Sequence, residues 1–157
     1  MKKSIFLLIL AVCVFFSGCS NEFAKEDYNN TSKIAQTDNY AAQVSKTTTK
    51  NGSVTFSVSK FDGYITIWEQ TMTSDTNLPA NVSLSLASGT AKLVLVDGNR
   101  NVTTLVEHKS EASNDITGKS SPDAVVRLTK GKNMIKLVGY DCEKVEVEIT
   151  FGEVTAR

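Results

Sequence analysis

The stretch from residue 145 to residue 151 alternates strictly between apolar and polar side chains and reads Val-Glu-Val-Glu-Ile-Thr-Phe. Successive side chains of a β-strand point to opposite faces of a sheet, so this pattern predicts a strand with one buried and one solvent-exposed face. Glu146 and Glu148 then share the solvent face. A position on an ordinary exposed face gives no reason to assign these two carboxylates a catalytic role.

The same alternation recurs along the chain from residue 51 onward, without any stretch of sustained helical periodicity. The further candidate strands cover residues 54–58, 65–67, 82–86, 93–96, 102–106, 124–128 and 134–138. Gly, Asn and Asp, which favour tight turns, separate many of them. Two longer polar gaps, near 71–81 and 109–123, are predicted to be loops.

About eight short strands in roughly 100 residues predict an all-β fold, an antiparallel β-sandwich. An immunoglobulin-like order is one alternative, although its Cys…Trp…Cys signature is missing from the sequence. A jelly-roll-like order, of the sort found in carbohydrate-binding modules, fits equally well. The pattern predicts the layers and leaves the strand order open.

The N-terminus has a different composition. Lys2 and Lys3 precede a run of 13 almost entirely apolar residues, 4–16. A positive start followed by a short apolar run is typical of a secretory signal peptide. The run is shorter than the roughly 20 residues that a permanent transmembrane helix needs.

The apolar run ends in Phe16-Ser17-Gly18-Cys19. This tetrapeptide resembles the lipobox of bacterial lipoprotein precursors, although Phe16 stands where that family usually has Leu. The resemblance implies cleavage after Gly18, diacylglycerol on the Cys19 sulfur, and a mature protein held on the extracytoplasmic face of the cell membrane. Residues 1–18 would then be the signal peptide, and two or more acyl chains would give lasting attachment.

Residues 19–50 are predicted to be the lipidated cysteine followed by a flexible, disordered polar linker, because Asn, Thr, Ser, Lys and Gln dominate and apolar residues are scattered. A coil of this length would reach roughly 30 Å. The β-sandwich domain is expected to span residues 51–157.

Charge and cysteine content exclude some classes of function. The whole chain has 17 basic and 17 acidic residues, so nothing favours nucleic acid as a partner. Cys142 is the only cysteine after Cys19, and without a nearby His or second Cys it is interpreted as an inert apolar residue.

Candidate catalytic and metal sites are weak. The single histidine, His108, is assigned to the start of the polar 109–123 loop, and no Gly-x-Ser-x-Gly motif accompanies it. The segment 97–101 matches the opening of a calcium loop, but Val102 and His108 stand where that loop needs Gly and Glu, and a hairpin turn explains it fully. Gly118-Lys119-Ser120 lacks the first Gly of a phosphate-binding loop. No enzyme, metal or cofactor is therefore predicted.

Tyr64 and Trp68 are the best remaining candidates for ligand contact. If Ile65 and Ile67 face the core, Tyr64 and Trp68 form an exposed aromatic pair that suits stacking against a sugar ring or a protein partner. The preferred alternative is a strand covered on both faces, in which Trp68 helps to fill the core.

The sequence thus predicts a membrane-anchored surface lipoprotein with a non-catalytic β-sandwich for binding or envelope interaction. Its partners would be the membrane, through lipid on Cys19, and a glycan or an envelope protein. The alternative is a carbohydrate-binding module for cell-wall or external glycan.

Overall fold

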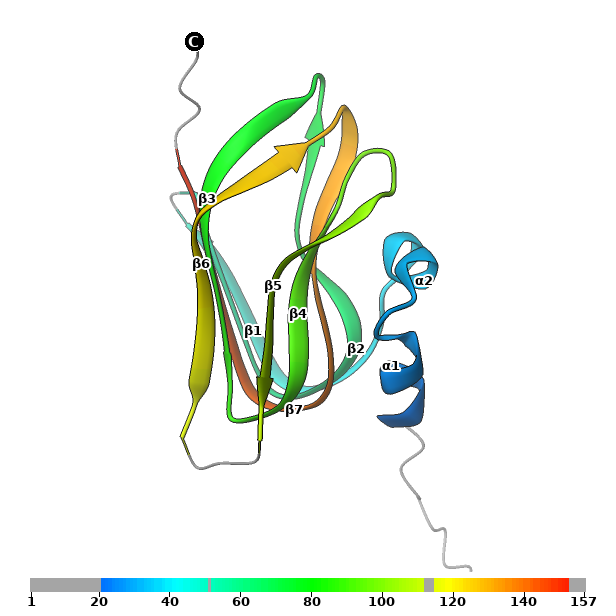
Figure 1. The fold of residues 1–157 in the computed structure, drawn as a ribbon, viewed down its shortest axis with the longest axis vertical. Helices are drawn as coiled ribbons and strands as arrows, with labels where there is room; N and C mark the ends of the chain where they lie inside the picture. The colour runs from blue at the N-terminus through cyan, green and yellow to red at the C-terminus, as the bar shows by residue number, and fades with distance from the viewer. Residues whose placement is uncertain (1–20, 51, 112–114, 153–157) are drawn as a thin grey trace, which may run out of the picture.

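The computed structural model describes residues 21–50, 52–111 and 115–152, which form two short helices and seven antiparallel strands (Figure 1). The helices are α1 (Asn21–Asp27) and α2 (Thr31–Gln36). The strands are β1 (Asn39–Lys50), β2 (Ser53–Met72), β3 (Thr76–Leu86), β4 (Ser88–Val96), β5 (Val102–Ser110), β6 (Thr117–Leu128) and β7 (Gly131–Phe151).

Two long strands, β2 and β7, run through both layers of the sandwich. The first half of β2 pairs with the second half of β7, and this pair continues outward to β1 on one side and to β3 and β6 on the other. The second half of β2 pairs with the first half of β7, which is flanked in turn by β4 and β5. One hydrogen-bonded sheet therefore folds over itself into two layers.

The bend in the two long strands, which we call the crease, is marked by a register shift between Phe61 and Gly63. Gly63 has φ +111, and a Cβ there would lie 2.1 Å from the carbonyl oxygen of Asn39. Only glycine suits this conformation and this close approach. A register shift of this kind marks a β-bulge, and a bulge increases the local bending of a strand, which is what the crease requires.

The main core fills the space between the two layers with the inward side chains predicted by alternation. It includes the buried residues Val54, Phe56, Val58, Phe61, Val82, Leu84, Leu86, Leu93, Leu95, Val126, Leu128, Ile135, Leu137, Val145, Val147 and Ile149. The antiparallel β-sandwich is therefore confirmed.

A second, smaller core lies on the outer face of the β2–β7–β4 layer, beneath α1 and α2. Tyr28, Ile34 and Ala35 of the helical segment are buried against the sheet. Their partners from the sheet are Tyr64, Val94, Val96, Met134 and Val138. This explains why β4 is apolar on both faces: one face meets the main core and the other meets the helices.

The prediction of a flexible linker is wrong for residues 21–50, because they form α1, α2 and β1. Asn30 caps α2 by accepting a hydrogen bond from the backbone N–H of Lys33, at 3.1 Å. β1 then pairs with β2 over its whole length as an edge strand with exposed side chains. Cys19 and the predicted signal peptide, residues 1–18, lie outside the described residues.

The remaining differences from the predicted strands concern their ends. β2 and β7 each join two candidate strands into one, because the crease bends them without breaking their pairing. The predicted loops are also shorter than expected, since β2 extends to Met72, β5 to Ser110, and β6 starts at Thr117. No helix within the described ranges is long and apolar enough to cross a membrane.

Candidate functional site

Tyr64 and Trp68 do not form the exposed aromatic pair considered from the sequence. Tyr64 is only 2% exposed and belongs to the core under the helices. A register shift between Thr66 and Trp68 inserts an extra residue into β2 and turns Trp68 to the other face. There Trp68 is half-buried against the main core, with its ring centroid 4.9 Å from that of Phe151. The preferred alternative, a strand covered on both faces, is confirmed.

His108 and Cys142 each contact neighbouring groups of the β-sandwich. His108 lies within β5 rather than in a loop, and its Nε2 is 2.9 Å from the hydroxyl of Thr117 at the start of β6. Cys142 is buried beside the crease, and its Sγ is 3.3 Å from the Thr90 carbonyl oxygen. Burial raises the pKa of the Cys142 thiol to about 12, so at neutral pH it is a protonated, unreactive group.

The segment 97–101 forms the turn between β4 and β5. The Asp97 side chain accepts hydrogen bonds from the backbone N–H groups of Asn99, at 2.9 Å, and of Asn101, at 2.8 Å. The carboxylate therefore stabilises the turn itself, as the hairpin interpretation requires. In the part of the chain that the structure describes, no group of three or more His, Cys, Asp or Glu could hold a metal ion.

A polar surface that the sequence pattern could not assemble covers the outer face of the layer formed by β1, β2, β7, β3 and β6. We call it the hydroxyl face. Its outward side chains are Lys46 and Thr48 from β1, Thr55 and Ser57 from β2, Glu146, Glu148 and Thr150 from β7, Asn81, Ser83 and Ser85 from β3, and Ser120 from β6.

The strand register arranges these side chains in rows centred on β7. Glu146 lies between Ser57 and Ser85, its pairing partners on β2 and β3. Two residues further on, Glu148 lies between Thr55 and Ser83 in the same way. Paired positions in a sheet are about 5 Å apart, so each carboxylate has a hydroxyl on both sides.

Small side chains beside longer glutamates leave the hydroxyl face hollowed. One groove, of about 330 Å³, runs between β1 and β3 and is lined by Lys46, Ser57 and Glu146 among others. The next groove, of about 280 Å³, reaches Ser120 and Pro122. Ser83 and Glu148 line both grooves, so the two adjoin across β7.

The chemistry of the hydroxyl face is hydrogen bonding without stacking. Serine and threonine hydroxyls both donate and accept, and ionised glutamates accept only. The aromatic residue that borders the first groove, Phe56, is only 3% exposed and packs in the main core, so its ring is not available for stacking. Such a surface suits a ligand that carries many O–H or N–H groups and is approached from solvent.

A third groove, of about 530 Å³, lies at the crease and is lined by Gln43, Lys60, Asp62, Ser88, Asp141 and Glu143, among others. The Asp62 carboxylate accepts a hydrogen bond from the backbone N–H of Asp141, at 2.7 Å, and so ties β2 to β7 at the bend. Burial, with a smaller effect of the Asp141 charge, raises the pKa of Asp62. Lys60 and Glu143 form an ion pair of 3.4 Å across the same strands. These contacts hold β2 and β7 together at the crease.

Sequence signals for the hydroxyl face were present but incomplete. The outward positions of Ser57, Ser83 and Glu148 follow from alternation within each strand. Alternation does not give strand order, however, and only the placement of β7 between β2 and β3 brings these side chains together. β1, whose lysines border the face, was missed altogether.

No protein-family model matches this chain, and no curated protein matches it significantly. Among solved structures, a carbohydrate-binding module of Cellvibrio mixtus lichenase 5A, in complex with cellotriose, is similar with 11% identity and a TM-score of 0.38 over 74% of this chain and 90% of that one. The family 35 module of Paenibacillus barcinonensis shares 16% identity, with a TM-score of 0.34 over 74% of this chain and 98% of that one.

The exo-beta-1,3-galactanase of Phanerochaete chrysosporium, determined with galactose, shares 13% identity with a TM-score of 0.36. This match covers 73% of the present chain and 28% of the galactanase chain. With identities and TM-scores this low, the similarities say nothing of which ligand this chain binds.

Proposed function

We propose that the protein is a lipid-anchored surface protein whose β-sandwich is a non-catalytic binding module. The anchor is supported by the charged start, the apolar run and the lipobox-like Phe16-Ser17-Gly18-Cys19. It places the folded body on the extracytoplasmic face of the cell membrane, held by acyl chains on Cys19.

The observation that carries the binding role is the arrangement of the hydroxyl face, where Glu146 and Glu148 each lie between two hydroxyl residues along adjoining grooves. The two candidate nucleophile and base groups have structural surroundings. Burial raises the pKa of the Cys142 thiol, and the His108 ring contacts the hydroxyl of Thr117. The face offers an extended set of hydrogen-bonding groups, which suits recognition of a ligand.

Mass spectrometry of the protein from bacterial membranes tests the anchor. We expect a mature chain that begins at Cys19 and carries added acyl mass. Cys19→Ser should abolish the added mass and membrane association. Cys13→Ser is the matched control, since Cys13 lies within the apolar run and should leave both unchanged. A protein that keeps residues 1–18, or one released without acyl groups, would contradict the anchor.

The second candidate function is binding of a cell-wall or external glycan. A glycan presents many hydroxyls, which the serines, threonines and glutamates of the hydroxyl face can match. Because Phe56 at the first groove is buried in the main core, the contacts would be hydrogen bonds, and Trp68 would take no part.

Affinity electrophoresis of residues 21–157 in gels containing soluble polysaccharides tests this candidate. We expect retardation that Glu148→Lys abolishes, because the substitution replaces a central acceptor of both grooves by a donor. Glu111→Lys makes the same charge change at an exposed position outside both grooves and should leave migration in the glycan gel unaffected relative to a blank gel. If no polysaccharide retards the protein, the proposal of glycan binding is rejected. That result would not bear on the proposed lipid anchor.

A further inference from the structure

The distance between the proposed anchor and the folded body is set by covalent geometry. α1 begins at Asn21, and Ser20 is the only residue between it and Cys19. A fully extended chain advances at most about 3.6 Å per residue, so the Cα atoms of Cys19 and Asn21 lie within about 7 Å of each other. A chain this short leaves no room for a spacer.

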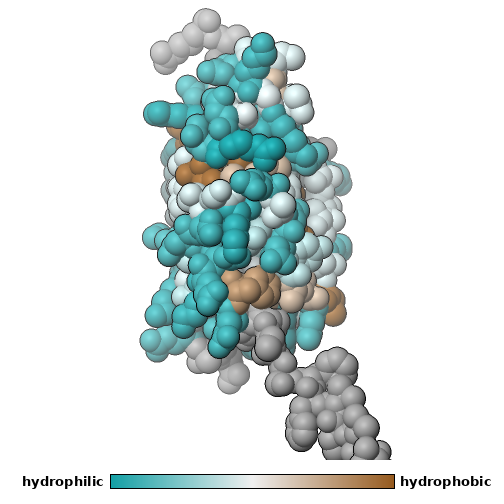
Figure 2. Space-filling view, turned by 90° about the vertical axis from the view of Figure 1, so that its right-hand side faces the viewer, coloured by the Kyte–Doolittle hydropathy of each residue, from teal (hydrophilic) through white to brown (hydrophobic). Residues whose placement is uncertain are grey.

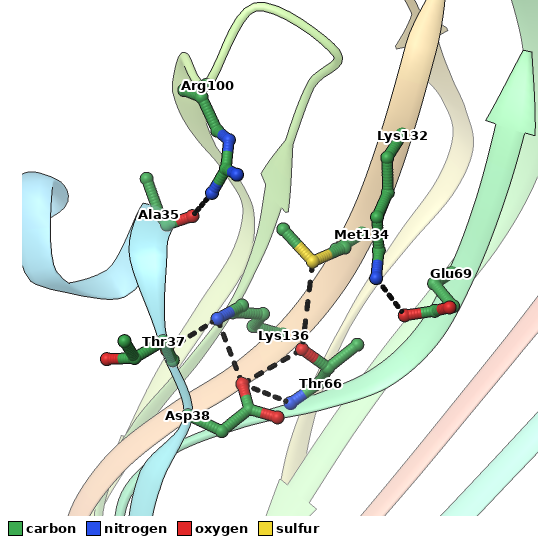
Figure 3. Close-up of polar contacts among 9 residues, drawn as sticks. All are labelled: Ala35, Thr37, Asp38, Thr66, Glu69, Arg100, Lys132, Met134 and Lys136. Atoms are coloured by element: carbon green, nitrogen blue, oxygen red, sulfur yellow. Dashed lines mark hydrogen bonds and ion pairs between the residues drawn. The ribbon is translucent and has the colours of Figure 1, made fainter.

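The helical segment cannot serve as a spacer either, because side chains fix it to the sheet. The hydroxyl of Tyr28, just after α1, donates a hydrogen bond of 2.7 Å to Glu107 on β5, and its ring packs edge-on against Tyr140 with centroids 5.1 Å apart. Nη1 of Arg100 donates a hydrogen bond of 2.6 Å to the carbonyl oxygen of Ala35 at the end of α2 (Figure 3).

α1 begins at the end of the sandwich where the crease lies (Figure 1). In α1, the Lys25 ammonium is 5.8 Å from the ring centroid of Tyr140, which precedes Asp141 of the crease groove. The turn between β3 and β4 lies at the same end, since Ser88 lines that groove. We call this end of the molecule the crease end.

The opposite end carries three turns, β2–β3, β4–β5 and β6–β7, and we call it the three-turn end. Asp75, between β2 and β3, accepts a hydrogen bond of 2.8 Å from the backbone N–H of Lys130, between β6 and β7. The backbone N–H of Gly98, between β4 and β5, donates to Asn133 at 3.2 Å. β4 connects the two ends, and its nine residues span about 30 Å at about 3.3 Å per residue.

The side chains of the crease end suit the headgroup layer of a membrane rather than its interior. The crease groove carries charges of both signs, Lys60 among them. Near that groove, Tyr40 is 48% and Val44 86% exposed, and these two side chains provide apolar contacts. Around the two helices the surface is mostly hydrophilic, with small apolar areas (Figure 2).

We infer that the crease end faces the membrane surface, at the level of the lipid headgroups, and that the three-turn end points away from it. The inference rests on the proposed lipid anchor. In this orientation the strands of the hydroxyl face run roughly outward from the bilayer, so its grooves open sideways to solvent. The three-turn end lies about 30 Å further out.

The orientation is tested with the full-length lipidated protein in vesicles of phosphatidylethanolamine and phosphatidylglycerol that contain a lipid with a nitroxide on its headgroup. A fluorophore is attached either at Gln43→Cys, in the crease groove, or at Asn99→Cys, in the β4–β5 turn. Cys142 is buried and its thiol pKa is raised, so it will not compete for the label. Thermal melts of both labelled proteins establish that they are folded.

Short-range quenching should be several-fold stronger at position 43 than at position 99. Inserting about 30 Gly and Ser residues between Ser20 and Asn21, with a reach of about 30 Å, should remove most of the difference. Equal quenching without the insertion, or stronger quenching at position 99, would overturn the orientation. Protein that does not float with the vesicles would instead refute the anchor, which is a separate outcome.

Discussion

At the scale of single residues, an ion pair between buried Lys136 and partly exposed Asp38 fixes the segment that precedes β1. Lys136 is 1% exposed, and its Nζ donates hydrogen bonds to Asp38 at 2.9 Å and to the Thr37 carbonyl oxygen at 2.7 Å (Figure 3). Asp38 also accepts hydrogen bonds from the backbone N–H and the hydroxyl of Thr66. A buried ammonium needs such partners, because an unpaired charge in the interior is strongly destabilising.

We expect Asp38→Asn to lower the free energy of unfolding by about 2 kcal/mol at neutral pH, because Lys136 loses its charged partner but keeps the neighbouring oxygens. Glu69→Gln is the matched control. It breaks the Lys132–Glu69 pair of 2.8 Å, which is exposed on both sides and should contribute less than about 1 kcal/mol. Urea denaturation measures both values, and equal losses would contradict the prediction.

The pH dependence of the same pair follows from the pKa of Asp38. Partial burial alone would raise this pKa, but hydrogen bonds from Lys136 and Thr66 and the Lys136 charge outweigh it, so the pKa is lowered. The contribution of the ionised Asp38 carboxylate to stability is therefore complete above the pKa of a free Asp, about 3.9. That contribution is lost as the pH falls through the lower pKa of the folded state. The difference between wild type and Asp38→Asn should be flat above about pH 5 and shrink below pH 4.

At the scale of elements, α1 and α2 show why a polar sequence was mistaken for a linker. The helices have 7 and 6 residues, too few for a repeating apolar stripe to be recognised. Their burial depends on Ala24, Tyr28, Ile34 and Ala35, separated by polar residues. The information that would have identified them lies in β4, which is apolar on both faces and so requires a cover.

Substitutions in this segment should separate a packed element from a linker. Ile34→Ala removes a fully buried side chain from α2, and we expect a loss of about 2–4 kcal/mol in the free energy of unfolding. Val44→Gly, ten residues later, should leave stability unchanged or raise it by up to about 1 kcal/mol, because Val44 is exposed and has φ +46. Thermal or urea unfolding gives both, and a neutral Ile34→Ala would contradict the packing of α2.

At the scale of the whole molecule, alternation within strands predicted the sandwich and its core correctly. Val54 to Val58 and Val145 to Ile149 are buried at the predicted alternate positions. Trp68 was open to two interpretations because a single extra residue in β2 reverses the face, and no local pattern reveals a bulge. The hydroxyl face depends on strand order, which pairs residues far apart in the sequence.

We expect a chain truncated to residues 51–157 to be unstable. It would lack β1 and the helices, and would expose Tyr64, Val94 and Met134 of the second core to water. We expect aggregation or binding of a hydrophobic dye, compared with a soluble, cooperatively unfolding protein of residues 21–157. Size-exclusion chromatography and dye fluorescence distinguish the two, and a stable monomer of 51–157 would show that the helical segment is dispensable.

The position of β7 in the sheet governs when this protein can fold. β7 is the last strand of the described residues, yet it is the shared neighbour of β2, β3 and β4. Until Gly131–Phe151 has left the ribosome, those three strands have no common partner, and neither layer can close. The sandwich of a nascent chain built this way can close only after that segment has been synthesised, however early the other strands emerge.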